Sequence, residues 1–313
     1  MRGTKLSILF APALVLICGC ASPPGPATES EAPRTPALTE TQMRQIDEIT
    51  GTSGTHFPEE DVYKVTFPRT EVAVTVDGRP FHPFQGMTSW AAFSPVAEGE
   101  VLVMGDLTVF EDEVSPAMSA ALDNGLEVTA LHNHFLHDKP RLMFMHIGGR
   151  GPIDRLAGAV RKALDAIAAV RQDSPNPSEV FPGAPLSGEN SITAEPLDAI
   201  LAKGSANNGM YKVTLGRKGQ MHGVEFGTQM GLNTWAAFAG SDAGAVVDGD
   251  FAMRESEVQP VLKALRTAGI HVVAIHNHMI HDQPRYVFLH YWGKGPAQEL
   301  AGGLRSALDV LGD

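Results

Sequence analysis

Cysteine is almost absent from this sequence. The chain of 313 residues holds two cysteines, Cys18 and Cys20, and both lie near its beginning. The rest of the chain therefore has no thiol that could form a disulfide, attack a substrate or coordinate a metal ion. Any metal site there must be built from histidine, aspartate, glutamate or backbone groups.

Positive charge is also scarce. Lysine and arginine number 24 against 36 aspartates and glutamates, which gives a formal net charge of -12. We expect no nucleic-acid partner, because no basic surface is available to neutralise phosphates. A P-loop, a Gly-rich dinucleotide fingerprint, a Gly-x-Ser-x-Gly elbow and a His-Glu-x-x-His helix are missing too, so the common signatures of nucleotide and hydrolase sites are not present.

The hydrophobic run at the start of the chain is too short to span a membrane comfortably. It extends from Leu6 to Cys18, follows two basic residues and has the proportions of a signal peptide. It ends in Ile-Cys-Gly-Cys, which is similar to a bacterial lipobox. This pattern predicts a signal peptide over residues 1–19, cleavage before Cys20 and a lipid on its thiol. An ordinary secretory signal is the alternative.

A tether follows the predicted lipidation site. Residues 20–40 are rich in proline, serine, threonine and glutamate and cannot bury apolar area. We therefore expect the protein to be held at the cell envelope by its N-terminal lipid. In a Gram-negative cell, Ala21 is compatible with the outer membrane, facing the periplasm.

The rest of the chain is an internal duplication. We place one repeat over residues 41–170, a Pro/Gly/Ser-rich linker over 171–193 and a second repeat over 194–313. Trp-Ala-Ala-Phe, Gly-Asp and Glu-Val each occur in both repeats, and a histidine-rich motif recurs 144 positions later. Such a duplication predicts two copies of one domain related by a pseudo-twofold axis.

Each repeat combines strands with helices. Alternating apolar residues predict strands over "VYKVTF", "VAVTV", "SWAAF", "EVLVMGDLTVF", "LEVTALHNHF" and "PRLMFMHIGG", the last two forming an antiparallel hairpin. Helical spacing predicts a short helix over "EVSPAMSAALDNG" and a longer one over "PIDRLAGAVRKALDAI". We therefore expect an α+β fold, in which each repeat has an antiparallel-dominated sheet and two or three helices.

Histidines gather in this hairpin. Side chains alternate along a strand, so His132 and His134 share a face with Val128 and are expected to continue the core-side row. A hairpin centred near Lys139 would place His146 opposite His132 on that face. Neutral imidazoles that converge in this way are good ligands for zinc, copper, nickel or iron, with zinc the first candidate. The predicted ligands in the two repeats are His132, His134, His137, His146, His276, His278, His281 and His290.

Other functions of the hairpin remain open at this point. It could form a metal-free polar or catalytic pocket, or its histidines could be purely structural. If a metal is bound, three imidazoles leave a position for water, and a metal-dependent hydrolase acting on an envelope substrate becomes the alternative to simple metal or small-ligand binding. A non-enzymatic interaction module is the third interpretation. The substrate, the ligand and the catalytic residues are not determined by the sequence.

Four charged residues of the motif are expected beside the imidazoles or on a ligand, with an ion pair the favoured role for the arginines: Asp138, Arg141, Asp282 and Arg285. Asp106 and Asp250 follow glycines and are predicted at turns, with a hydrogen bond to a ligating histidine as the alternative. Glu113 and Glu257 are predicted to begin helices.

The combination of these features resembles a known family. A lipobox followed by two domains, each with "HNHxxHDxPRxxFxHxxGxGP" and an "LA..(L/V)R.AL" helix, is similar to the LppY/LpqO-type lipoproteins, a domain family of unknown function. The resemblance implies an envelope lipoprotein. It implies no activity and no catalytic residue.

Overall fold

The computed structural model describes residues 37–183, 185–186 and 188–312. These residues belong to one compact unit. The predicted signal peptide, the lipidation site Cys20 and most of the tether lie outside the described residues. Among the described residues, no helix is long and apolar enough to cross a membrane.

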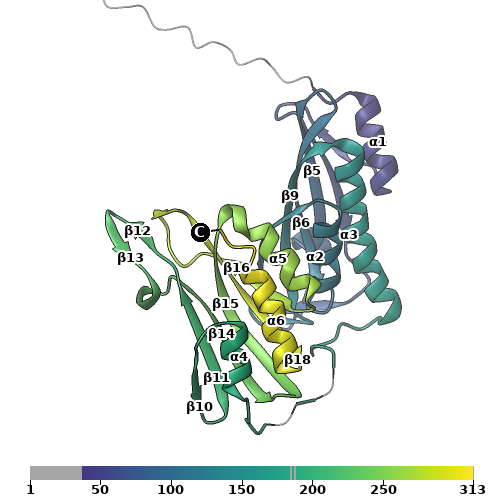
Figure 1. The fold of residues 1–313 in the computed structure, drawn as a ribbon. Coiled ribbons are helices and arrows are strands. Elements are labelled where there is room, and N and C mark those ends of the chain that lie inside the picture. Colours follow the sequence, from purple (N-terminus) through teal and green to yellow (C-terminus); the bar gives the residue numbers. More distant parts are fainter. Residues whose placement is uncertain (1–36, 184, 187, 313) are drawn as a thin grey trace, which may run out of the picture. The chain divides into compact units, whose positions relative to one another are not determined.

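The first copy has three α-helices and nine strands (Figure 1). Its elements in chain order are α1 (Glu40–Thr50), β1 (Thr55–Phe57), β2 (Val62–Pro68), β3 (Val74–Val76), β4 (Arg79–Phe81), η1 (Pro83–Gln85), β5 (Thr88–Ala97), β6 (Glu100–Phe110), α2 (Val114–Asp123), β7 (Glu127–His132), β8 (Asp138–Lys139), β9 (Leu142–Pro152) and α3 (Ile153–Asp173).

The second copy repeats this order after the linker. Its elements are α4 (Ala194–Ile200), β10 (Ser205–Asn207), β11 (Met210–Gly216), β12 (Gly219–Met221), β13 (Val224–Phe226), η2 (Thr228–Met230), β14 (Asn233–Ser241), β15 (Gly244–Arg254), η3 (Glu255–Glu257), α5 (Val258–Thr267), β16 (His271–His276), β17 (Asp282–Gln283), β18 (Tyr286–Gly295) and α6 (Ala297–Leu308).

One sheet runs through both copies. Its 12 strands have the order β1-β2-β5-β6-β9-β7-β16-β18-β15-β14-β11-β10, and neighbouring strands pair antiparallel throughout. Read from either end, the order passes through corresponding strands of the two copies. The copies meet in the middle, where β7 pairs with β16 and Leu131 lies opposite Ile275.

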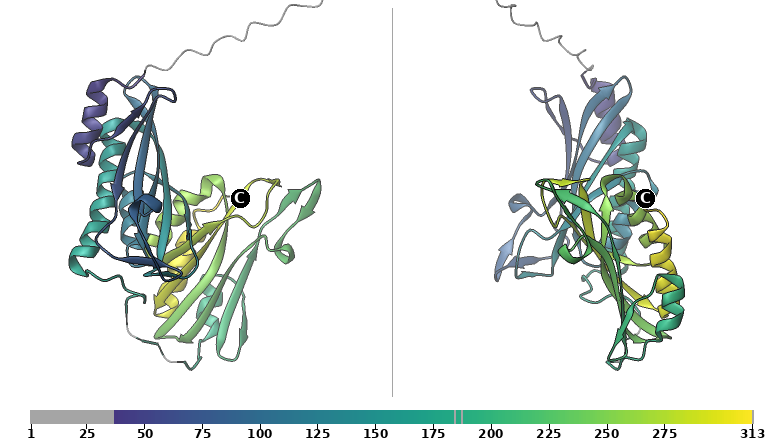
Figure 2. Two further views of the ribbon diagram at one scale, coloured as in Figure 1. Left: turned by 180° about the vertical axis from the view of Figure 1, so that it is seen from behind. Right: turned by 60° about the vertical axis from the view of Figure 1, so that its left-hand side comes forward.

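The helices pack on one face of this sheet. In the first copy, α3 lies against β6 and β9, and Figure 2 shows it beside the strands together with α1. The buried residues Leu156, Val160 and Ala163 recur at helical spacing and face the main core, because this stripe leaves water when it meets the sheet. We call the opposite side of the sheet the open face.

A small three-stranded sheet lies beside the open face in each copy. In the first copy it has the order β4-β3-β8, and in the second β13-β12-β17. Each encloses a satellite core with residues of the main sheet, such as Phe144 in the first copy and Phe288 in the second. β8 and β17 lie in the loops that join the two strands of each histidine hairpin, residues 133–141 and 277–285, which we call the histidine loops. Pairing within the small sheet therefore fixes the position of each histidine loop.

The predicted mixed fold with a mostly antiparallel sheet is confirmed, as is the hairpin, in which β7 pairs with β9. The two predicted helices correspond to α2 and α3. Helices α1 and α4 were not predicted. Helix α1 begins at a capping box in which Thr39 accepts from the backbone N–H of Gln42 at 3.3 Å.

Candidate metal centre

A β-bulge decides which face the histidines occupy. The pairing of β7 with β9 shifts between Val128 and Ala130, so that Val128 and Leu131 both point into the main core. His132 therefore lies on the open face with Ala130. The prediction that the histidines continue the core-side row was wrong, because the bulge reverses the alternation. The same shift occurs between Val272 and Ala274 in the second copy.

The bulge also changes the register of the hairpin. His146 lies opposite Ala130, and His132 lies opposite Phe144, so the prediction that His146 faces His132 was wrong by two residues. A shift of two keeps both side chains on one face. Their rings therefore still meet as diagonal neighbours, with centroids 5.1 Å apart.

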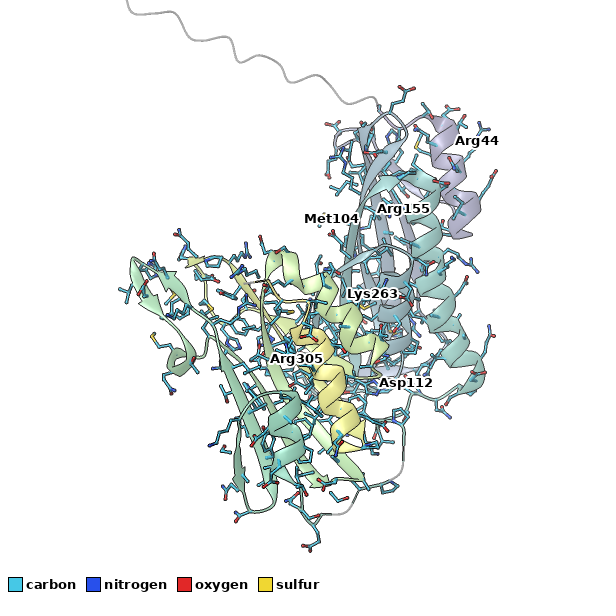
Figure 3. The ribbon with its side chains drawn as sticks, viewed as in Figure 1. Arg44, Met104, Asp112, Arg155, Lys263 and Arg305 are labelled. Atoms are coloured by element: carbon cyan, nitrogen blue, oxygen red, sulfur yellow. The ribbon has the colours of Figure 1, made fainter. Side chains whose placement is uncertain are left out.

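Asp106 and Asp250 are strand residues, and their prediction as turn residues was wrong. Each lies inside an 11-residue strand, where Asp106 pairs with His146 and Asp250 pairs with His290. Both are buried, with 8% and 3% of their surface exposed. Met104, two residues before Asp106 on the same side of β6, points away from α3 in Figure 3. The carboxylates therefore stand beside the imidazoles on the open face.

The glycine before each aspartate allows this close packing. At Gly249 an added Cβ would lie 2.1 Å from the carbonyl oxygen of Trp235 and 2.2 Å from the hydroxyl of Tyr291. That hydroxyl donates a hydrogen bond of 2.9 Å to the same Trp235 carbonyl. No side chain fits there, which explains why Gly-Asp occurs in both copies.

In the second copy three ligand atoms converge. Nε2 of His278 lies 3.1 Å from Nε2 of His276 and 3.0 Å from Oδ2 of Asp250. Ligand atoms that surround a zinc ion at about 2.0–2.2 Å lie roughly 3.0–3.5 Å from one another, so this spacing matches a metal site. Two imidazole nitrogens this close need a proton or a cation between them.

Other atoms beside these three ligand atoms are also consistent with metal binding. Nδ1 of His290 donates a 3.0 Å hydrogen bond to the carbonyl of Gly249, which leaves its Nε2 with a free lone pair. The His290 ring lies 4.7 Å from that of His276. Oδ1 of Asp250 and Nδ1 of His276 are buried without a hydrogen-bond partner in the described structure. Buried polar atoms are rarely left unpaired, so the group has unused binding capacity.

Burial shifts the protonation of this group toward neutral forms. It lowers the pKa of His276 to about 4, aided by the neighbouring His290 and His278. Burial raises the pKa of Asp250, against the opposing effect of His278 and His290. An imidazole that is neutral at pH 7 keeps the lone pair that a metal ion needs. A cation would also offset the cost of the buried carboxylate.

The first copy assembles the same side chains less tightly. The ring of His132 lies 5.2 Å from that of His134 and 5.1 Å from that of His146. Burial lowers the pKa of His134; Asp106 opposes this shift, and His132 and His146 add to it. In the described residues, the set with all ligand atoms within 4.8 Å of one another is Asp250, His276 and His278.

An aromatic ring supports the second histidine of each motif. His278 stacks on Phe288 with centroids 3.6 Å apart and 10° between the planes, and His134 stacks on Phe144 at 3.4 Å and 4°. Both phenylalanines belong to the satellite cores. Packing therefore fixes ring planes that would otherwise rotate at the exposed end of the strand.

The predicted ligands His137 and His281 lie in the turn of the hairpin, with left-handed backbones of φ 65° and 68°. The ring of His281 lies 5.5 Å from that of His222 in a separate pocket of about 390 Å³. Asp138 and Asp282 are buried, and each accepts a 2.6 Å hydrogen bond from a backbone N–H four residues on, at Leu142 and Tyr286. These carboxylates brace the turn that holds the histidine loop.

The arginines of the motif form exposed ion pairs, Arg141 with Glu111 at 3.9 Å and Arg285 with Glu255 at 3.6 Å. Glu113 and Glu257 precede α2 and α5 without capping them. Each binds an arginine instead, with 2.5 Å between Glu113 and the buried Arg69 and 2.6 Å between Glu257 and the half-buried Arg217. Neither arginine was predicted from the sequence, because no local pattern marks a partner about 40 residues away.

Comparison with known proteins gives one family. The family described as Domain of Unknown Function (DUF1259) matches residues 44–166 and again residues 195–310. A comparison with curated proteins gives no match. The crystal structure of a trimeric bacterial microcompartment shell protein, PduB, is 14% identical over 82% of this chain and 91% of that chain, but its TM-score of 0.19 is too low to support any inference. The chain belongs to the family described as Domain of Unknown Function (DUF1259) and contains two tandem copies of its domain.

Proposed function

We propose that the protein binds a divalent transition metal ion, with zinc the first candidate, at the histidine–aspartate group of each copy. This group consists of Asp106, His132, His134 and His146 in the first copy and of Asp250, His276, His278 and His290 in the second. The observation that supports this most strongly is the convergence of Asp250 Oδ2, His276 Nε2 and His278 Nε2 within 4.8 Å. Three imidazoles and a carboxylate suit zinc or iron, and the body of the chain offers no thiolate that would favour softer ions.

The two proposed centres share one face of one sheet. Leu131 and Ile275, which pair at the junction, are equivalent residues of the two copies, and both point into the main core. His132 and His276 follow them directly and therefore both project from the open face. The strand order, which passes through corresponding strands from either end, supports a pseudo-twofold axis through this junction.

Metal content tests the proposal. Protein without an affinity tag is loaded with zinc, passed through a desalting column and measured by mass spectrometry. We expect about two zinc ions per chain in the wild type and about one in His276→Ala or in His132→Ala. His222→Ala is the matched control, since this exposed histidine lies outside the group, and it retains both ions. Wild-type protein without bound zinc contradicts the proposal.

A second candidate function is metal-dependent hydrolysis. It is favoured by the position of His278, whose side chain is 31% exposed while Asp250 beneath it is 4% exposed, so that solvent reaches one side of the group. A metal held by three protein ligands keeps a position for water. The function predicts chelator-sensitive turnover of ester, amide or phosphoester substrates that Asp250→Asn abolishes. If the protein binds the metal but turns over none of these substrates, the hydrolase function is rejected and metal binding alone remains.

We also propose that the protein is a lipid-anchored lipoprotein of the cell envelope, of the LppY/LpqO type. The Ile-Cys-Gly-Cys sequence after a short apolar run supports this, as does the acidic, proline-rich stretch that follows it. Metabolic labelling with a radioactive fatty acid should mark the wild type and leave Cys20→Ser unlabelled. A label that persists in Cys20→Ser, or recovery of the wild type in the soluble fraction, contradicts the proposal.

A further inference from the structure

The two copies differ where they meet. In the second copy, Gln259 at the start of α5 reaches the edge of β7 in the first copy. Its side-chain oxygen accepts from the backbone N–H of Val128 at 2.9 Å, and its amide nitrogen donates to the carbonyl of Val128 at 2.9 Å. β7 pairs with β16 only at Leu131, so Val128 has no strand neighbour on that side and forms a local open edge. The Gln259 carboxamide satisfies its backbone N–H and C=O there.

Among the described residues, the corresponding position in the second copy, on β16, has no side chain that plays the part of Gln259. The residue equivalent to Gln259 is Ser115, and the residue equivalent to Val128 is Val272. Ser115 is shorter, and its hydroxyl instead makes a 2.7 Å hydrogen bond with Nδ1 of His271. In the described part of the chain, no side chain is hydrogen-bonded to the backbone of Val272.

A cavity of about 670 Å³ adjoins this edge. Its apolar wall includes Val114, Pro116, Met143, Val180, Phe181, Val272 and Val273. Phe181 comes from the linker, and its ring lies 4.7 Å from that of His271 and 6.0 Å from that of Trp292. The volume and the mainly apolar lining are typical of a site for a small organic ligand.

An arginine gives the cavity a positive group. Arg266 lines it where the first copy has Leu122. It donates to the Ser119 hydroxyl at 3.2 Å and to the Ile270 carbonyl at 2.7 Å, and no carboxylate pairs with it in the described structure. Burial lowers the pKa of Arg266. A half-buried guanidinium without an acidic partner is suited to an anionic ligand.

The acids that line the cavity do not supply that partner. Asp112, labelled in Figure 3, forms an ion pair with Arg171 and accepts a 2.9 Å hydrogen bond from the backbone of Ser178. Glu111 pairs with Arg141. The third acid of the lining, Glu179, forms no ion pair with Arg266 in the described structure. The positive charge of Arg266 is therefore available inside the cavity.

We propose that this cavity binds the carboxyl-terminal end of a short extended peptide, which pairs one backbone amide with Val272 and places its carboxylate on Arg266. The carboxamide of Gln259 shows which chemical group fits such an edge, because it already occupies the equivalent position on Val128. Strand addition at an open edge is a common way to recognise peptides. This site does not involve the histidine–aspartate groups, so it stands or falls independently of metal binding.

Calorimetric titration with the tripeptide Ala-Val-Ala tests the proposal, and its carboxyl-terminal amide serves as a second probe. We expect the free acid to bind at least tenfold more tightly than the amide. Arg266→Leu, which introduces the residue of the first copy, should remove this difference. Ser115→Gln should fill the edge as Gln259 does on the other side and weaken both peptides at least tenfold.

Ser205→Gln is the matched control, because it makes the same substitution at an exposed position outside the cavity and should bind like the wild type. Thermal unfolding checks that each variant is folded; if Ser115→Gln is not, the Arg266→Leu comparison decides. No binding of either peptide to the wild type at millimolar concentration overturns the proposal. So does equal binding of acid and amide, or unchanged binding by folded Ser115→Gln.

Discussion

Leu131 of the first copy lies directly opposite Ile275 of the second, at the centre of the 12-stranded sheet. Both side chains are buried in one main core, with 0% and 5% of their surface exposed. Because the sheet and its core continue across this pair, the two copies form one cooperative structure, and two independent domains joined by a linker are not expected.

Leu131→Ala should therefore destabilise the whole described body. We expect a loss of about 3 kcal/mol in the free energy of unfolding, from lost apolar burial and the cavity that remains. Urea unfolding followed by circular dichroism and by tryptophan fluorescence should show one transition at a lower midpoint, the same for both signals. Separate transitions, with only one shifted by the substitution, would mean that the copies fold independently.

Phe288→Leu should weaken metal binding without touching a ligand. It removes the ring that fixes the plane of His278 while keeping an apolar side chain. We expect about a tenfold loss of zinc affinity, as for other residues that orient ligands, and a stability loss of about 1–2 kcal/mol. Competition with a chromogenic chelator measures the affinity. Phe238→Leu, equally buried but in the main core, should lose stability and keep its affinity.

The ion pair between Glu257 and Arg217 should make stability depend on pH. Burial raises the pKa of Glu257, but hydrogen bonds from Arg217 and from the backbone of Arg254 outweigh this and lower the pKa below its ordinary value of 4.5. The carboxylate thus adds stability that is complete above pH 4.5 and is lost as the pH falls through the lowered value.

Glu257→Gln should accordingly cost about 3 kcal/mol at pH 7, because Arg217, whose side chain is only 12% exposed, keeps its charge without its partner. The difference from the wild type should shrink as the pH falls below 4.5, which urea titrations between pH 7 and pH 3 can follow. The exposed Glu48→Gln serves as control and should differ little at any pH. A difference that grows toward acid would contradict the assigned pKa direction.

Gly249→Ala and Gly158→Ala should have opposite effects. At Gly249 the new methyl group meets the Trp235 carbonyl and the Tyr291 hydroxyl, so we expect a loss of about 3 kcal/mol and, since Asp250 moves, weaker zinc binding. At Gly158, inside α3, an added Cβ would meet no atom within 4 Å apart from the backbone of its own helix. Alanine there should stabilise the helix by up to about 1 kcal/mol. Thermal unfolding and zinc titration of both variants measure this. A harmless Gly249→Ala would show that the two strands are farther apart than described.

Local periodicity was sufficient to predict the main helices and the hairpin of β7 and β9. It failed at the bulge between Val128 and Ala130, where no glycine or proline interrupts the pattern, and so the histidines were assigned to the wrong face. The prediction that His132 and His146 lie close together still holds, because the two-residue shift in register keeps both side chains on one face.

Contacts between distant segments could not be predicted in this way. Asp106 joins the histidines only because β6 pairs with β9, and sequence spacing does not reveal that pairing. The recurrence of Gly-Asp 144 positions later was the available signal, but a glycine before an aspartate also suits a turn. Arg69 and Arg217 pair with glutamates 44 and 40 residues away, which again only the fold reveals.

Anomalous X-ray diffraction at the zinc edge, from crystals grown with zinc, tests the proposed metal centre most directly. We predict a peak about 2.0–2.2 Å from Asp250 Oδ2, His276 Nε2 and His278 Nε2. Zinc-saturated crystals with no peak at these three atoms, or with a peak only between His222 and His281, would contradict the proposed metal centre.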